Sequence, residues 1–275
     1  MVVKKPKILF VYDIPDEDYW KDGLWAAINL LEKDFEIHRY NLSDNKPPKS
    51  QMGPPFPDSD WNTQFTIGWG AFGSPVDKWL RHHPFKKGLC IAGNAFPPQN
   101  IDTYDVLFYE TEWYRPQISS HKNTIRAFGV NTDIFKPNPI SPKLFDYLVC
   151  GAFANWKRQE LINSKFGVRI AIGEVQRDNM VESIKIMGNL IIGGCGVIPA
   201  VLPSELVKFY CATKVAYAPM DIYGGGERFV WEAMACGIPV EILADNLKLQ
   251  ELVNSEVKDH HWYAQRLKEG ISKIL

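Results

Sequence analysis

The sequence predicts an α/β protein made of two doubly wound, Rossmann-like parallel-sheet domains, and two observations lead to this prediction. Short apolar strand patterns alternate with amphipathic helix patterns along the whole chain, as in repeated βα units. A proline-rich segment with little apolar content, Lys136–Lys143, interrupts this alternation near the middle, as an interdomain linker does. We therefore expect one domain over residues 1–137, a second over 144–257, and a C-terminal helix over 258–275 that packs back on the first domain.

The first half opens with a buried strand, Ile8–Tyr12, which a turn-like acidic segment follows. Residues 24–31 carry apolar side chains at the i, i+3, i+4, i+7 spacing of an amphipathic helix. Residues 43–63 are rich in Pro, Gly, Ser, Asp and Asn and predict a long loop. The remaining expected strands of this half are Phe35–Leu42, Phe65–Trp69, Gly88–Ala92 and Val106–Tyr109.

The second half restarts the alternation directly after the proline-rich segment. Its expected strands are Phe145–Cys150, Val168–Gly173, Leu190–Gly193, Val215–Ala218 and Pro239–Leu243. Its expected helices are one from about Asn155, then Ser204–Cys211, Glu227–Cys236, and a last helix with Tyr263, Leu267, Ile271 and Ile274 on one face. Ligands of such sheets collect outside the carboxyl ends of the strands at the topological switch point, so we expect a site in a cleft that the two domains face.

The composition narrows the function classes. Hydrophobic residues make up 45% and charged residues 23%, close to the average of globular proteins, so disorder is not expected. The formal net charge is −1. Affinity for DNA or RNA rests largely on neutralising phosphates, and the basic excess that this requires is missing here.

The cysteines and the apolar runs bear on metal binding and localisation. No CxxC or Cys/His ligand spacing occurs, so we expect reduced core thiols and no metal site. The thiols concerned are Cys90, Cys150, Cys195, Cys211 and Cys236. No run reaches the roughly 18 apolar residues of a membrane span, and the N-terminal apolar stretch is too short for a signal peptide. We expect a cytoplasmic protein without a transmembrane segment.

The most informative motif is a glycine-rich turn in front of a well-delimited helix. Gly224–Gly226 precede a helix that begins near Glu227, and Gly237 and Pro239 stop it. Three glycines before a helix N-terminus let backbone N–H groups approach an anion, which the helix dipole also favours. Arg228 adds a fixed cation. The segment therefore predicts a pyrophosphate cradle, with an ordinary flexible turn as the alternative.

The residues Glu232–Val240, EAMACGIPV, resemble the second half of the E-x7-E donor-site motif of GT-B glycosyltransferases of family 4, or group 1. The resemblance implies the GT-B fold, in which two Rossmann-like domains face a cleft. It also implies that Glu232 accepts hydrogen bonds from the ribose hydroxyls of a nucleotide, a role that suits a carboxylate. The first motif acid is absent, because Gly224 occupies its position. Asp221 and Glu227 are the nearest acids, and Glu227 at the helix start is the expected substitute.

Two further segments agree in order with the same family. Arg126–Pro137 is similar to the PNGVDTDxFxP segment that closes the N-terminal domain, and Tyr147–Arg158 occupies the place of the GR-x4-KG strand and loop. The resemblance implies that Lys157 neutralises the donor diphosphate. Ala152 stands where the family has an arginine, and Arg158 is the expected compensation.

The resemblance also assigns the remaining site residues. Val197 and Ile198 lie in the segment that usually packs against the nucleotide base, with core packing as the alternative. Gly23 resembles part of a Gly-rich turn after the first strand, and Asn94 stands where a histidine contacts the transferred sugar, so both are expected acceptor or sugar contacts. The expected catalytic residues are Lys157, Arg158 and Glu227. The expected nucleotide-sugar contacts are Glu232, Gly224, Gly225, Gly226, Arg228, Phe229, Val197 and Ile198.

The resemblance, together with these residues, implies a hexosyltransferase that moves a sugar from a UDP- or GDP-sugar to an acceptor hydroxyl. The resemblance implies a retaining, metal-independent reaction in which the nucleotide-sugar is a substrate and no cofactor is needed. The acceptor is left open between a glycan, a lipid-linked molecule and a small molecule, with a modified DNA base less favoured. Two alternatives stay open: a catalytically degenerate GT-B protein that binds nucleotide-sugar without turnover, and a GT-B-fold sugar-nucleotide 2-epimerase.

Overall fold

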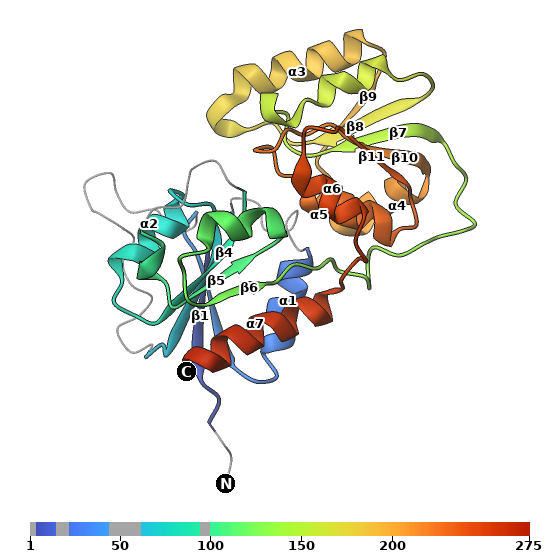
Figure 1. Ribbon diagram of the computed structural model, residues 1–275. Coiled ribbons are helices and arrows are strands. Elements are labelled where there is room, and N and C mark those ends of the chain that lie inside the picture. The colour runs from blue at the N-terminus through green and yellow to red at the C-terminus, as the bar shows by residue number, and fades with distance from the viewer. Residues whose placement is uncertain (1–3, 15–21, 44–61, 94–99) are drawn as a thin grey trace. The chain divides into compact units, whose positions relative to one another are not determined.

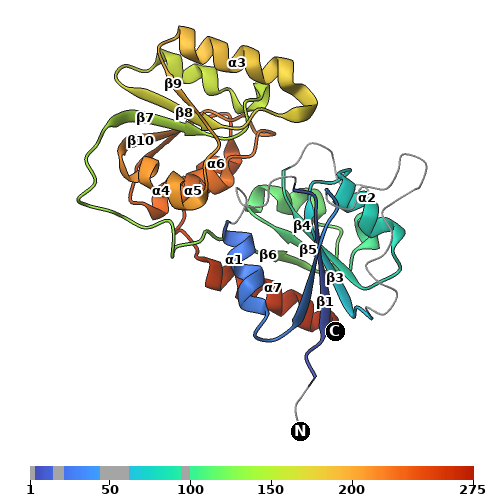
Figure 2. The same cartoon turned by 180° about the vertical axis from the view of Figure 1, so that it is seen from behind.

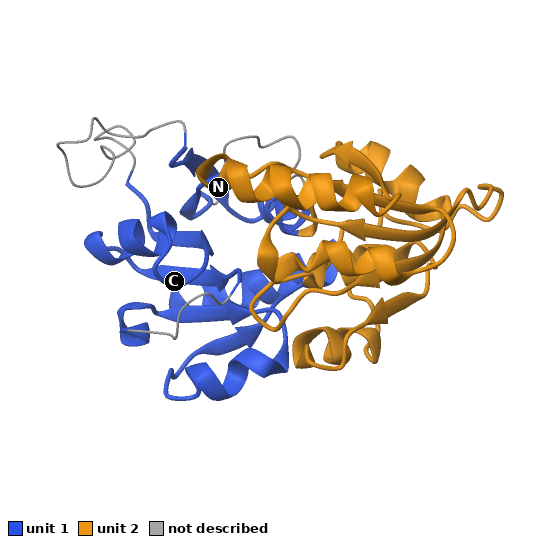
Figure 3. Ribbon diagram, turned by 90° about the horizontal axis from the view of Figure 1, so that it is seen from above, with its two compact units in different colours: residues 1–17, 24–128, 260–275 blue, residues 18–23, 129–259 orange. Residues whose placement is uncertain are grey.

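The structure, a computed structural model, describes residues 4–14, 22–43, 62–93 and 100–275. The chain divides into two compact units, which Figure 3 shows in different colours. The first comprises residues 1–17, 24–128 and 260–275, and the second comprises residues 18–23 and 129–259. The proline-rich segment Lys136–Lys143 lies inside the second unit.

The first unit contains a six-stranded sheet in the order β2-β1-β3-β4-β5-β6. Figure 1 labels β1, β4, β5 and β6 of this sheet. Its strands are β1 Lys7–Tyr12, β2 Glu36–Asn41, β3 Phe65–Gly70, β4 Lys87–Ile91, β5 Val106–Tyr109 and β6 Thr124–Arg126. All its strand pairs are parallel, which confirms the predicted sheet type. Ile8, Leu9, Phe10 and Val11 of β1 are at most 1% exposed, because helices or loops cover both faces of a parallel sheet.

The helices of the first unit come from both ends of the chain. They are α1 Gly23–Leu31, α2 Pro75–His82 and α7 His260–Ile274, with short 3₁₀ helices η2 Ile101–Thr103 and η3 Glu112–Ile118. Helix α7 lies against β5 and β6, beside α1 (Figures 1 and 2). A Cβ at Gly270 would lie 2.5 Å from the Phe108 ring, so only glycine allows α7 to approach the sheet this closely.

The second unit contains a five-stranded sheet in the order β11-β10-β7-β8-β9. Its strands are β7 Phe145–Cys150, β8 Arg169–Gly173, β9 Gly196–Pro199, β10 Thr213–Ala218 and β11 Val240–Ile242, and all pairs are parallel. The chain starts at β7, adds β8 and β9 on one side, and then returns to add β10 and β11 on the other. The topological switch point therefore lies between β7 and β10, and parallel strands place the loops that follow them at one edge.

The helices of the second unit correct two predictions. They are α3 Met180–Ile192, α4 Pro203–Cys211, α5 Glu227–Ala235 and α6 Leu247–Val253, with 3₁₀ helices η4 Asn155–Lys157, η5 Gln159–Ser164 and η6 Arg177–Asn179. The strand predicted at Leu190–Gly193 is wrong: Ser183, Ile186 and Leu190 form the buried face of α3, and Gly193 caps that helix. The helix predicted from Asn155 is instead η4 and η5, because Arg158 between them is left-handed (φ 48°) and ends an α-helical path.

Two other expectations concern the thiols and the membrane. All five cysteines are free and buried, as predicted for reduced thiols in the core. Across the described part of the chain, none of the helices combines the length and apolar character that crossing a membrane requires.

Candidate functional site

The switch point of the second sheet is lined by two loops that meet. The loop after β7, Gly151–Ala154, leads into η4, and the loop after β10, Pro219–Gly226, leads into α5. The backbone N–H of Asp221 donates to the carbonyl oxygen of Trp156 at 3.1 Å, which joins the second loop to η4. The fold thereby brings the segment around Lys157 next to the glycine-rich turn, although about 70 residues separate them in the sequence.

Lys157, the last residue of η4, projects its ammonium toward this turn. Its Nζ lies 3.4 Å from the position that a Cβ at Gly225 would occupy. Within the described ranges, no hydrogen bond or ion pair holds this ammonium. Burial lowers the pKa of Lys157 to about 8, against the opposing attraction of Glu227, because taking a charged group out of water disfavours its charged form. A partly desolvated cation without a bonded partner therefore faces the glycine-rich turn.

The three positions of the turn require glycine for two different reasons. Gly225 (φ 68°) and Gly226 (φ 104°) are left-handed, a conformation that L-side chains rarely adopt. Gly224 is constrained by space instead, because a Cβ there would lie 2.3 Å from the carbonyl oxygen of Trp156. An acid at position 224, where the family motif has one, has no room in this backbone arrangement.

The glycine turn ends at the N-terminus of α5, a helix of nine residues. The first-turn amides of a helix lack intrahelical partners and carry the positive end of its dipole, so they attract an anion. Glu227, the first residue of α5, is buried, and its Oε1 accepts from the fully buried Nζ of Lys248 at 2.7 Å. Burial opposes ionisation of Glu227, but this ion pair prevails and lowers its pKa.

Glu232 lies one turn further along α5 and is 4% exposed. Its Oε2 accepts from the hydroxyl of Tyr210 at 2.9 Å, and its Oε1 is 3.6 Å from Nε of Arg228. Burial raises the pKa of Glu232 to about 7, more than Arg228 and the tyrosine hydroxyl lower it. Arg228 interacts with two carboxylates, because its Nη1 also donates to Asp22 at 2.8 Å. Glu232 is thus a buried carboxyl that titrates near neutral pH.

Arg158 differs from its neighbour Lys157. Its Nη1 donates to Asp245 at 2.5 Å, and its Nη2 is 4.0 Å from a carboxylate oxygen of Asp221. Two carboxylates therefore already balance the guanidinium charge. Arg158 lies next to the site with its charge balanced. The ammonium of Lys157, in contrast, forms no ion pair within the described residues.

Solved structures of other proteins share the two-sheet architecture of this chain. No family model matches the chain, and no curated protein matches it in sequence. Sucrose-phosphate synthase from Thermosynechococcus elongatus matches with a TM-score of 0.65 at 12% identity, over 98% of this chain and 90% of that chain. The HepE protein of Anabaena, in complex with UDP-glucose, matches with a TM-score of 0.62 at 12% identity, over 97% and 90%. The chain has the GT-B fold. A candidate UDP-N-acetylglucosamine 2-epimerase from Listeria monocytogenes shares the fold with a TM-score of 0.52 at 14% identity, over 98% and 88%.

Within this GT-B fold, the other predicted site residues lie at different places. Val197 and Ile198 are half-buried in β9, the edge strand that β8 separates from β7. Phe229 is buried in α5 and lies against Tyr210, with ring centroids 5.8 Å apart. Gly23, which itself belongs to the second unit, lies so close to Gly129 that a Cβ would be 2.0 Å from the carbonyl oxygen of that residue. The predicted contact Asn94 lies outside the described residues.

Sequence reasoning missed several residues of the site. Lys248 and Asn246 come from the start of α6, and Tyr210 comes from the end of α4. The Nδ2 of Asn246 donates to the carbonyl oxygens of Met220 at 3.0 Å and Asp221 at 2.8 Å, which fixes the loop after β10. One signal was available: Lys248 stands four residues before Leu252, so it shares a helix face with that apolar residue, and a lysine on a buried face needs a partner.

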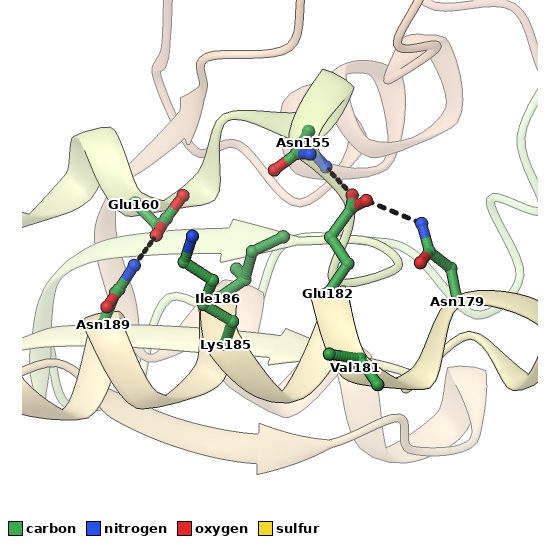
Figure 4. A pocket seen from close by; sticks show the side chains of 8 residues that line it. All are labelled: Asn155, Glu160, Asn179, Val181, Glu182, Lys185, Ile186 and Asn189. Atoms are coloured by element: carbon green, nitrogen blue, oxygen red, sulfur yellow. Dashed lines mark hydrogen bonds between the residues drawn. The ribbon is translucent and has the colours of Figure 1, made fainter.

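A cavity of about 410 Å³ lies elsewhere in the GT-B fold, between α3 and the η4–η5 segment (Figure 4). Its polar groups largely satisfy one another: Glu182 accepts from the backbone N–H of Asn155 at 2.8 Å and from Asn179 at 2.6 Å, and Glu160 accepts from Asn189 at 2.5 Å. The bonds of Glu182 to Asn155 and of Asn189 to Glu160 tie α3 to the segment that carries Lys157. We interpret the cavity as part of the support of η4 and not as the ligand site.

Proposed function

We propose that this GT-B protein is a glycosyltransferase that binds a UDP- or GDP-sugar at the switch point of its second unit and transfers the sugar to an acceptor hydroxyl. The single observation that carries the proposal is the unbonded Lys157 ammonium beside Gly225 and the N-terminus of α5. The glycosyltransferases among the structures of similar fold, including the UDP-glucose complex of HepE, support the substrate class.

The donor diphosphate would lie over the glycine turn. The first-turn amides of α5 and the Lys157 ammonium both favour negative charge at that point. Because burial already disfavours the charged form of Lys157, a bound phosphate would relieve that penalty and raise the pKa of Lys157 above its unliganded value of about 8. Arg158, which two carboxylates hold, would contribute mainly to positioning the loop.

The ribose would be recognised by Glu232. An ionised carboxylate has about four acceptor positions, and in this site Tyr210 and Arg228 occupy only part of them. Ribose hydroxyls that donate to the remaining positions would stabilise the ionised form. Phe229 supports this arrangement by packing against the Tyr210 ring. Val197 and Ile198 remain our proposal for contacts to the base.

The reaction we propose breaks the bond between the anomeric carbon and the diphosphate oxygen and forms a bond from that carbon to the acceptor oxygen. The proton of the acceptor hydroxyl passes to the departing diphosphate. Lys157 and the α5 amides would stabilise the negative charge that develops on the leaving group, without a metal ion. Glu227 would accept from a sugar hydroxyl in place of the missing motif acid, and retention of configuration is what the Glu232–Val240 resemblance supports. Gly23 and Asn94 are proposed contacts to the sugar or acceptor.

One observation favours a second function, the binding of nucleotide-sugar without turnover. Gly224 occupies the position of the first motif acid, and the carbonyl oxygen of Trp156 leaves no space for a side chain there. If Glu227 does not replace that acid, the protein would hold the donor and leave it intact.

A panel of UDP-, GDP- and ADP-sugars tests these functions. We expect UDP or GDP to bind, and the donor to release nucleoside diphosphate, whereas Lys157→Met weakens nucleotide binding by about ten-fold to a hundred-fold. Lys208→Met is the matched control, since Lys208 forms an exposed pair with Glu205 on α4.

Each alternative has its own outcome in this panel. Unchanged nucleotide affinity in Lys157→Met would refute the site, and binding without release would identify the non-catalytic function. Conversion of UDP-N-acetylglucosamine into its 2-epimer would identify an epimerase.

A further inference from the structure

Lys248 is a fully buried lysine at the edge of the site, and the proposed reaction does not use it. It is the second residue of α6, and its side chain is 0% exposed. Asn246 caps α6 by accepting from the N–H of Leu249 at 3.2 Å, and it also holds two carbonyls of the loop after β10. These hydrogen bonds join the start of α6 to the loop that contains the glycine-rich turn, and they fix the position of Lys248 beside that loop.

The two oxygens of Glu227 have different neighbours. Its Oε1 accepts from Nζ of Lys248 at 2.7 Å. Its Oε2 lies 3.5 Å from the position of a Cβ at Gly225, and Nζ of Lys157 lies 3.4 Å from the same position. Glu227 and Lys157 thus flank one glycine, and Glu227 is the carboxylate with the strongest attraction for Lys157.

The other charges around Lys157 are engaged elsewhere. Arg228 pairs with Asp22 and approaches Glu232. Asp221 lies 4.0 Å from Arg158. Of the charged groups that act on Lys157, only Glu227 is therefore placed to capture its ammonium, and the Lys248 ammonium opposes this by holding Glu227.

We propose that Lys248 is a positioning residue that holds Glu227 away from Lys157 and so keeps the Lys157 ammonium available for the diphosphate of the donor. This inference rests on the proposed function for the identity of the anion. It makes Lys248 a determinant of nucleotide affinity that acts through Glu227 without touching the ligand. Neutralising Lys248 removes the buried counter-charge of Glu227, and Lys157 is the other cation that attracts this carboxylate.

The test measures UDP and GDP affinity by calorimetry between about pH 6 and pH 10. In the wild type, affinity should decline above about pH 8, where Lys157 loses its proton. Lys248→Met should bind about ten-fold more weakly at neutral pH, and its alkaline decline should move to higher pH, because Glu227 then pairs with Lys157 and raises the pKa of its ammonium.

A double variant separates positioning from structural support. Lys248→Met with Glu227→Gln should return the affinity to within about three-fold of the wild type, because no carboxylate is left to capture Lys157. Lys208→Met is again the surface control. If Lys248→Met does not fold, Lys248→Gln takes its place, since its amide can still donate to Glu227 without carrying a charge. Wild-type affinity and pH dependence in the single variant, or failure of the double variant to recover, overturns the inference.

A readout without ligand distinguishes this inference from the proposed function. NMR titration of isotope-labelled lysine side chains reports the pKa of Lys157 directly, and it should rise in Lys248→Met. If the wild type binds no nucleotide, the proposed function fails, and this titration still decides the role of Lys248: an unchanged pKa of Lys157 refutes it.

Discussion

The two units each bury a charged cluster in the first turn of a helix that follows a strand, and the two clusters differ in completeness. In the first unit, Asp77 of α2 accepts from the N–H of Gly73 at 2.7 Å, from Arg81 at 2.9 Å and from the hydroxyl of Tyr104. Every carboxylate oxygen there has a donor. In the second unit, Glu227 and Lys248 satisfy one another, but Lys157 beside them lacks a bonded partner in the described structure.

The difference separates a network that stabilises the fold from one that, in our proposal, is prepared for a ligand. A buried polar network stabilises a fold when all its members are satisfied, and an unpaired buried charge destabilises it. The sign of the Lys157 effect follows from its pKa, which is lowered from 10.5 to about 8 in the folded protein. Between those values the unfolded chain binds more protons, so stability should rise as the pH rises from about 8 to 10.5. Below pH 8, the donor diphosphate that we propose for this site would supply the missing stabilisation.

The largest expected effect is a loss of stability when the Asp77 cluster of the first unit is disrupted. Asp77→Ala leaves the hydroxyl of buried Tyr104 and the N–H of Gly73 without their acceptor, so we expect a loss of about 3 kcal/mol in the free energy of unfolding. Urea unfolding measures it, with Asp102→Ala, at an exposed position on η2, as the control. Nucleotide affinity of the protein that stays folded should not change. A selective loss of nucleotide binding without a loss of stability would reverse the roles we assign to the two clusters.

Glu232→Gln should have an intermediate effect, on binding and on its pH dependence. The pKa of Glu232 is raised from 4.5 to about 7, so the folded state holds this proton more tightly and stability falls as the pH rises between these values. The ionised form is also the better acceptor for ribose hydroxyls. We expect wild-type UDP affinity to fall below about pH 7, and the variant to bind about ten-fold more weakly at pH 8 and to lose that dependence. Calorimetric titrations at several pH values check this, and an acid decline that persists unchanged in the variant would contradict it.

The smallest effect is expected at Arg158, the paired neighbour of Lys157. Arg158→Met should lower nucleotide affinity by no more than about three-fold, because Asp245 and Asp221 already balance the guanidinium charge. The same titration, run beside Lys157→Met, measures both. An equal loss at the two positions would mean that the distinction between a paired and an unpaired cation does not hold in this site.

Much of the fold could be predicted from the sequence because its signals are local. Buried strands such as Ile8–Tyr12 and Phe145–Cys150 have apolar runs of strand length, and α5 has clear start and stop residues. The one misplaced strand, Leu190–Gly193, is an equally apolar run that continues the buried face of α3. Short apolar runs do not distinguish the two periodicities, so the error arose where the local signal was ambiguous.

The sequence by itself determined the α/β architecture, the glycine turn and the presence of Lys157, Glu227 and Glu232 near a capped helix, because these depend on residue type and short spacing. Tertiary structure alone decided which charges are paired. Trp156 excludes a side chain at position 224, Lys248 arrives from a separate helix, and Arg158 finds its carboxylates while Lys157 does not. Pairing depends on distances between segments that are remote in the chain, and folding sets those distances through the order of the strands around the switch point.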